Sequence, residues 1–126
     1  MTHIKTKVPA KLLIPVQGND VAPRFDMSSE AWIGWINSAG KVKNQEILVL
    51  PHPSAEGMCQ LILSQNAEVV ICGGIESEYF DYLEWKSIIV FDSVIATYAR
   101  AVEAYAQGEL TQGFTDITSH QAGAAS

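Results

Sequence analysis

The feature that most constrains this chain is a short apolar run, Val69 to Cys72, that is followed by Gly73 and Gly74. An apolar run of this length bounded by glycine is typical of a strand that is buried on both faces of a sheet. The glycine pair favours a sharp turn with positive φ, and the residues after it favour a helix. We therefore predict a central strand whose carboxyl end carries Cys72, at the edge where open α/β sheets bind ligands.

The composition indicates one domain and argues against several functions. The chain has 126 residues, 48% of them hydrophobic, which suits a single domain with a real core. Its net charge of -6, from 14 acidic and 8 basic residues, argues against nucleic acid and against anionic membrane surfaces as partners. No apolar run reaches the ~18 residues of a membrane span, and the first residues do not resemble an export signal. With two cysteines in such a chain, we expect a cytoplasmic protein without a structural disulfide.

The pattern predicts three segments in the chain. We expect a flexible N-terminus over residues 1–10, a folded domain over 11–110 and a disordered tail over 111–126, where only Phe114 and Ile117 could dock. Strands are predicted over 11–16, 31–37, 42–50, 69–72 and 87–91. Helices are predicted over 55–65 with Ser54 as N-cap, over 75–85, and over 94–107 with Asp92 or Ser93 as N-cap.

This order of elements matches an α/β, ribonuclease H-like three-layer fold. The expected sheet is mixed and five-stranded, with the order 3-2-1-4-5, strand 2 antiparallel and three helices. The third strand should enter the core at its apolar end, residues 47–50. The loop 17–30 and the turn after Cys72 should leave the same edge of the sheet side by side, and His52 should leave it there too. The sequence therefore predicts a candidate site at this edge.

A nuclease of this fold is disfavoured by the positions of the carboxylates. Two-metal phosphodiester cleavage needs several carboxylates that converge on two ions about 4 Å apart. The first strand, residues 11–16, contains neither Asp nor Glu, and the fourth offers only Glu68, at the end away from the site. We therefore expect a protein that is not an enzyme.

Two interpretations of Cys72 follow from its position. A thiolate beside a helix N-terminus has a lowered pKa and can ligate a soft metal or an iron–sulfur cluster. Alternatively, Cys72 is a small buried hydrophobic residue, as is also expected of Cys59. The turn glycines could hold an anion at the helix N-terminus, but Glu76 and Glu78 follow directly and would repel it.

Arg24 and His52 also allow two interpretations each. From its loop, Arg24 could bind an anionic ligand or form an ion pair with Asp20 or Asp26. His52 stands between two prolines and could ligate a metal or be an ordinary surface histidine. The chain contains neither CxxC nor HxxxH, so no zinc site is predicted.

Three blocks of the sequence resemble one known family. The segment from Leu13 to Asp26, LIPVQGNDVAPRFD, resembles the first strand and loop of the dinitrogenase iron–molybdenum cofactor family, the NifX/NafY-like domain also found at the end of NifB. The segment from Val69 to Ile75 is similar to the family's fourth strand and turn. The segment from Ala101 to Leu110 resembles its closing helix. Together the blocks span residues 11 to 110.

The resemblance implies a ribonuclease H-like fold without nuclease activity and a carrier or storage role in cofactor biosynthesis. The cargo would be the iron–molybdenum cofactor, its precursor or another iron- or molybdenum-containing sulfur cluster, and the partners would include cofactor-assembly or acceptor proteins. The implied cofactor-binding residues are Arg24, Phe25, Asp26, Cys72, Gly73 and Gly74, with Cys72 and His52 as candidate metal ligands.

An alternative hypothesis is a protein-interaction or regulatory module of the same fold that has lost cluster binding. Many family members have His-Phe-Gly where this chain has Arg24-Phe25-Asp26. Many also begin the following helix with small residues, where this chain has Glu76 and Glu78. Both differences and the acidic composition favour this alternative, whereas the resemblance makes the cluster carrier, with Cys72 as ligand and Arg24 balancing the charge, the first hypothesis.

Overall fold

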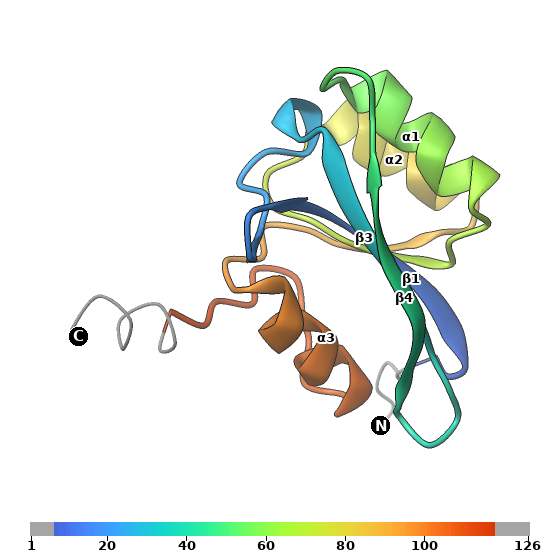
Figure 1. Ribbon diagram of the computed structural model, residues 1–126. Coiled ribbons are helices and arrows are strands. Elements are labelled where there is room, and N and C mark those ends of the chain that lie inside the picture. The colour runs from blue at the N-terminus through green and yellow to red at the C-terminus, as the bar shows by residue number, and fades with distance from the viewer. Residues whose placement is uncertain (1–6, 118–126) are drawn as a thin grey trace.

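The chain folds into three layers, with a mixed sheet between α1 and α2 on one face and α3 on the other (Figure 1). The computed structural model describes residues 7–117. Within that range, no helix is long and apolar enough to cross a membrane. The elements in chain order are β1 Ala10–Gln17, β2 Asp20–Val21, the 3-10 helix η1 Phe25–Met27, β3 Glu30–Ile36, β4 Val42–Val49, α1 Ala55–Ser64, β5 Val69–Ile71, α2 Ser77–Trp85, β6 Ile89–Phe91 and α3 Tyr98–Ala106.

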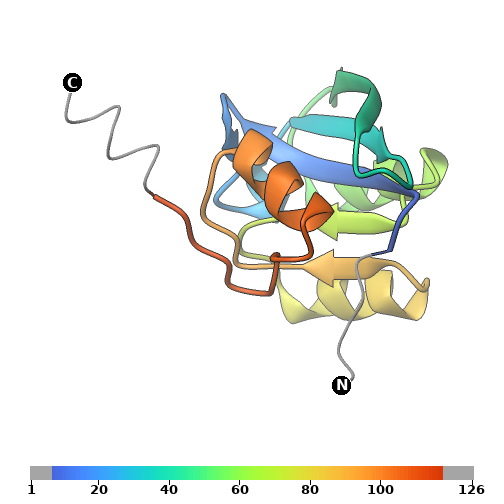
Figure 2. The ribbon, with the colours of Figure 1, turned by 90° about the horizontal axis from the view of Figure 1, so that it is seen from below.

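The sheet has the strand order β4-β3-β1-β5-β6, which is the predicted order, and β2 adds a short sixth strand beside β1. β3 is antiparallel to both β1 and β4. β1, β5 and β6 run parallel, and their carboxyl ends point to one side of the molecule (Figure 2). The predicted α/β architecture is therefore confirmed, with six strands rather than five.

β1 lies at the centre of the sheet because both of its faces are apolar. Leu12 and Ile14 pack into the core on the α3 side, whereas Leu13 packs into the core on the side of α1 and α2. Pro15 is tolerated in this strand although it has no N–H to donate. Its carbonyl accepts a hydrogen bond from the amide of Ala22 at 2.9 Å, so the missing donor faces β2, beyond the end of β5.

α1 begins where the sequence predicts, because the hydroxyl of Ser54 accepts a hydrogen bond from the amide of Gly57 at 2.9 Å. α2 begins at Ser77, two residues later than predicted, since Glu76 is extended. The start predicted for the third helix is wrong. α3 begins only at Tyr98, after its N-cap Thr97.

Residues 94–97 form an extended segment that pairs with the chain beyond α3. The amide of Ile95 donates to the carbonyl of Phe114 at 2.9 Å, and the amide of Asp116 donates back to Ile95 at 2.8 Å. Phe114 also packs against the core on the α3 side. The expectation of a disordered tail from residue 111 is therefore wrong for residues 111–117. Its remainder, 118–126, and residues 1–6 of the expected flexible N-terminus lie outside the described residues.

β4 meets the core with only one face of its apolar end. Leu48 and the following Leu50 pack against the core on the side of α1 and α2, whereas the side chains of Ile47 and Val49 are 43% and 70% exposed. The physical reason is that side chains alternate along a strand, and at the edge of the sheet, where β4 pairs only with β3, the second face is left uncovered. An apolar run in the sequence does not distinguish an edge strand from a central one.

Candidate functional site

The two predicted halves of the site meet through their backbones at the carboxyl end of the parallel strands. The amide of Phe25 donates to the carbonyl of Gly74, and the amide of Gly74 donates to the carbonyl of Pro23, both at 2.8 Å. Arg24 and Gly74 thus form a short parallel bridge. The structure therefore brings the loop after β1 and the turn after β5 together.

Gly73 makes this close approach possible. A Cβ atom at this position would lie 2.4 Å from the carbonyl oxygen of Ala22 and 2.5 Å from that of Pro23. Neither turn glycine has the positive φ that the sequence led us to expect. The amide of Gly74 is engaged by Pro23 and is not available to an anion, so the glycine pair packs two backbone segments together.

Cys72 is fully buried in the core beneath α1 and α2. Its burial, and then the nearby carboxylate of Asp92, raise the pKa of the thiol far above its ordinary value. The expected lowering of this pKa by a helix N-terminus is wrong, because α2 starts only at Ser77. Of the two interpretations of Cys72, the structure favours the neutral core residue over the metal ligand.

The side chains of Arg24 and Asp26 bind each other at the surface. Nε of Arg24 donates to Oδ1 of Asp26 at 3.1 Å, and Nη2 donates to Oδ2 at 2.7 Å. Phe25, between them in sequence, is 1% exposed and packs in the core, with its ring centroid 6.5 Å from that of Tyr79. Arg24 therefore forms one of the ion pairs considered from the sequence, and Phe25 anchors the loop rather than facing a ligand.

The surroundings of His52 are formed by other residues than those of this junction. It is exposed in the connection between β4 and α1, and lines a hollow together with Glu56, Gln60 and Ser64 of α1. Across residues 7–117, no group of three or more His, Cys, Asp or Glu side chains could hold a metal ion. The side chains predicted as ligands therefore do not fit a metal–sulfur cluster that this chain would ligate by itself.

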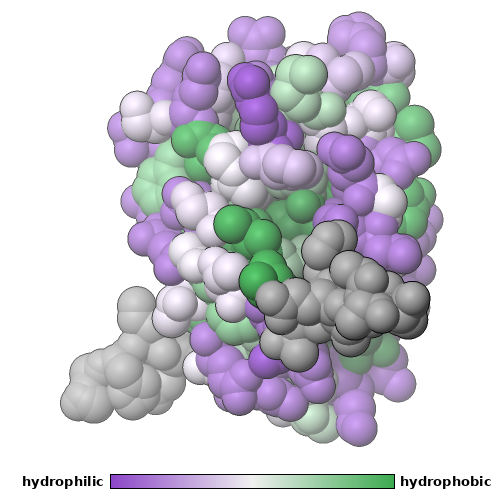
Figure 3. Space-filling model, turned by 90° about the vertical axis from the view of Figure 1, so that its left-hand side faces the viewer, coloured by the Kyte–Doolittle hydropathy of each residue, from purple (hydrophilic) through white to green (hydrophobic). Residues whose placement is uncertain are grey.

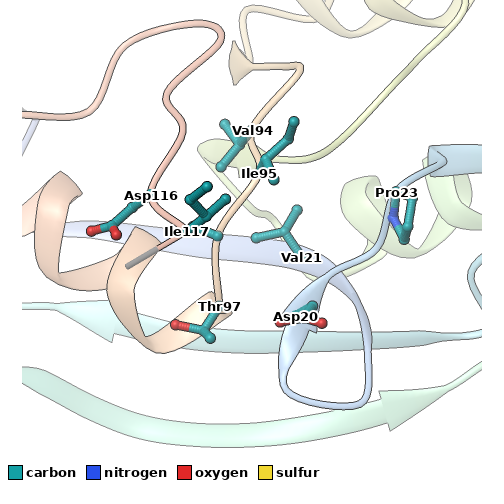
Figure 4. A pocket seen from close by; sticks show the side chains of 9 residues that line it. Asp20, Val21, Pro23, Val94, Ile95, Thr97, Asp116 and Ile117 are labelled. Carbon is teal, nitrogen blue, oxygen red and sulfur yellow. The ribbon is translucent and has the colours of Figure 1, made fainter. Parts of the chain in front are cut away.

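A cavity of about 300 Å³ lies at the same edge, on the α3 side, and sequence reasoning missed it (Figure 4). It lies between the start of the loop, the segment 94–97 and the segment that ends at Ile117. Ile95 and Ile117 line it and are 59% and 45% exposed. Viewed from this side, the surface shows an apolar patch surrounded by polar side chains (Figure 3).

The cavity was missed because it is built from two segments whose structure was predicted wrongly. Residues 94–97 were expected in a helix and 111–117 in a disordered tail, yet the two segments pair. The available signal was the presence of Phe114 and Ile117 in an otherwise polar stretch. Apolar residues in such a stretch indicate that it packs against the domain.

No protein-family model and no curated protein matches this chain. Several solved structures share its fold. The crystal structure of the protein PH0822 has a TM-score of 0.74 and 22% identity, covering 81% of this chain and 93% of that one. A protein of Methanocaldococcus jannaschii, provisionally named a dinitrogenase, has a TM-score of 0.70 and 18% identity, covering 84% of this chain and 96% of its own.

A third solved structure is a protein from Thermotoga, provisionally named a NifB protein and placed in the DUF35 family. Its TM-score is 0.61 at 20% identity, covering 82% of this chain and 92% of that one. The fold is shared. At these identities the likeness establishes the architecture over nearly the full length of each neighbour, and two of the three neighbours carry nitrogenase-related names.

Proposed function

We propose that this chain is a non-enzymatic protein of metal–sulfur cofactor assembly, of the kind that serves nitrogenase, and that it acts by binding another protein. Two observations support a role in metal–sulfur cofactor assembly. The fold is that of neighbours with nitrogenase-related names, and the sequence resembles the dinitrogenase iron–molybdenum cofactor family over residues 11 to 110.

The burial of Cys72 and the raised pKa of its thiol support the second part of the proposal, which is that the chain acts by binding another protein. A ligand to a cluster must reach the surface and be deprotonated, whereas this thiol is fully buried and has a raised pKa. Arg24 could balance the charge of an anionic cluster only by leaving Asp26, which holds it through two hydrogen bonds. Within residues 7–117, the burial of Cys72 and the pairing of Arg24 therefore favour a protein partner over a cluster of net negative charge.

The same edge has the properties of a protein-binding surface. Ile95 and Ile117 are exposed beside a cavity of about 300 Å³, and apolar side chains around a hollow with a polar rim are typical of contact sites. The carboxylate of Asp20 also lines the cavity, whereas that of Asp116, in the same lining, is already paired with Arg100 at 2.6 Å. Asp20 suits a partner with a basic group better than an anionic cargo.

Direct carriage of a cluster is the second candidate function, favoured by the sequence resemblance and by the names of the neighbours. The two candidates make opposite predictions for the purified chain. Under anaerobic conditions with iron, sulfide and molybdate, we expect the protein to remain colourless and free of metal. A bound metal with visible absorption would support the carrier function instead, and Cys72→Ser would then bleach it whereas Cys59→Ser would not.

Binding to a partner is tested separately, by titrating the chain against purified apo-dinitrogenase and against a purified NifB-type assembly protein. We expect binding to at least one of them, and Ile95→Asp should weaken it about tenfold or more by placing a charge in an apolar contact. Binding to neither protein, or binding that Ile95→Asp leaves unchanged, would overturn the proposal.

A further inference from the structure

α1 and α2 lie on the face of the sheet opposite α3 (Figure 1), and a groove between them shares no lining residue with the cavity at the carboxyl end. Its volume is about 430 Å³. Most of the lining side chains are apolar, aromatic or acidic, and one is a neutral amide. The lining residues are Cys59, Leu63, Tyr79 and Tyr82, the acidic Glu56 and Glu78, and Gln60.

An exposed aromatic pair continues the apolar lining toward the end of α2. Trp85 is 75% exposed and Tyr82 is 37% exposed, with their ring centroids 6.3 Å apart. Nζ of Lys86 lies 5.1 Å from the Trp85 ring centroid. Tryptophan and tyrosine contribute much of the binding energy at protein interfaces. Covering a tryptophan that is this exposed would bury a large apolar surface and so favour binding.

The charges within the two helices of this face are all negative, and the base Lys86 follows directly after α2. α1 and α2 carry four carboxylates and neither contains Lys or Arg. These are Glu56 in α1 and Glu78, Asp81 and Glu84 in α2. Desolvation, followed by the nearby carboxylates, raises the pKa of Tyr79 in the groove, as expected where the local potential is negative.

We propose that the groove between α1 and α2 is a docking site for a basic amphipathic helix of another protein. The apolar face of such a helix would cover Tyr82, Leu63 and Trp85, and its Lys or Arg side chains would pair with Glu56 and Glu78. Charge selects this occupant, since an acidic helix, or the same face of a second copy, would place like charges together. This proposal goes beyond cofactor assembly and does not depend on it.

The direct test uses two synthetic helical peptides of 18 residues that share one amphipathic pattern, built from Leu and Lys in one and from Leu and Glu in the other. The full chain is titrated with each and followed by amide NMR shifts and by the indole N–H signal of Trp85. We expect the basic peptide to bind and to shift α1, α2 and Trp85, and the acidic peptide not to bind.

Variants show whether the groove itself, rather than net charge, is responsible. Trp85→Ala should weaken the basic peptide about 30-fold, as for an interface hot spot. Glu56→Gln with Glu78→Gln should weaken it about 5- to 10-fold and reduce the salt dependence. The matched control, Glu30→Gln with Glu46→Gln, changes the net charge equally on other elements, and binding should stay within about twofold.

Four outcomes would overturn the proposal. They are equal affinity for the two peptides, shifts that map outside α1 and α2, an equal loss in the control double variant, and self-association that Trp85→Ala abolishes. Trp85 and the two glutamates are exposed, so their substitution should leave the core intact. Circular dichroism of each variant checks that it is folded.

Discussion

The amide of Phe25 donates a hydrogen bond to the carbonyl of Gly74 across 2.8 Å, and this bond joins the loop after β1 to the turn after β5. Phe25 is buried and Gly74 is exposed, so the bond links a core anchor to a surface turn. The junction therefore ties both segments of the carboxyl-end edge to the core.

Gly73→Ala should destabilise the protein by about 3 kcal/mol, because the new Cβ would overlap two backbone carbonyl oxygens that cannot move independently. Gly74→Ala is the matched control. Its Cβ would meet only the carbonyl of Pro23, at 3.4 Å, and should cost less than about 1 kcal/mol. Urea denaturation of both variants measures the difference, and equal losses would contradict the role assigned to Gly73.

Phe25→Ala should cost about 3–5 kcal/mol of unfolding free energy, as for other buried aromatic residues, and should loosen the loop that ends in β3. Arg24→Ala, one residue away, should change stability by no more than about 0.5 kcal/mol, because the ion pair with Asp26 is exposed to solvent. Thermal or urea unfolding compares the two. A larger loss for Arg24→Ala would show that the ion pair holds the loop.

Both thiols should be unreactive in the folded protein at pH 8 and should react with Ellman's reagent only after unfolding. Burial, followed by the carboxylate of Glu56, raises the pKa of Cys59 to about 11, and burial raises that of Cys72 further. Rapid reaction of the native protein would show that a thiol reaches solvent.

The same burial predicts how stability depends on alkaline pH. Unfolded thiols ionise above about pH 8.5 whereas the folded ones stay protonated, so the unfolded state binds fewer protons and stability falls as pH rises. The slope is about 1.4 kcal/mol per pH unit for each thiol between roughly pH 9 and 10. Urea denaturation across this range measures the slope, and Cys59→Ala should remove the contribution of one of the two thiols, about 1.4 kcal/mol per pH unit.

Arg100→Ala should release residues 111–117 from the domain. Nε of Arg100 donates to Asp116 at 2.6 Å, and its guanidinium also pairs with Glu103 and Glu109 and lies over the Phe114 ring. Exchange of the Asp116 amide with deuterium should then become about tenfold faster or more. Glu103→Ala, which removes only an exposed partner at 3.5 Å, serves as the control and should leave this exchange nearly unchanged.

The sequence was sufficient for the strand order and for the meeting of the Arg24 loop with the Cys72 turn, because both follow from hydrophobic runs, turn residues and the right-handedness of crossovers. The sequence was insufficient to predict which side chains at that edge are buried and which face solvent. Whether Cys72 faces a ligand or the core depends on what covers the strand, and the late start of α2 at Ser77 removed the expected helix N-terminus.

The error at the start of α3 has a similar cause. Val94 and Ile95 have helical spacing with Tyr98 and Val102, yet the amide of Ile95 is used by Phe114, far along the chain. A long-range pairing of this kind leaves no local pattern, because the tail that provides it is otherwise polar. The chemistry of the edge was therefore predicted less well than its position.

α3 also holds segments near both ends of the described chain. The hydroxyl of Tyr105 donates to the carbonyl of Lys7 at 2.6 Å, and Arg100 binds Asp116, so one helix of nine residues fastens both ends of residues 7–117. The two ends are therefore coupled through α3, although Lys7 leads directly into β1 and Asp116 also bonds to Ile95. A fusion protein or surface attachment at either terminus that displaces the Lys7 carbonyl or the Asp116 carboxylate would disturb the same helix.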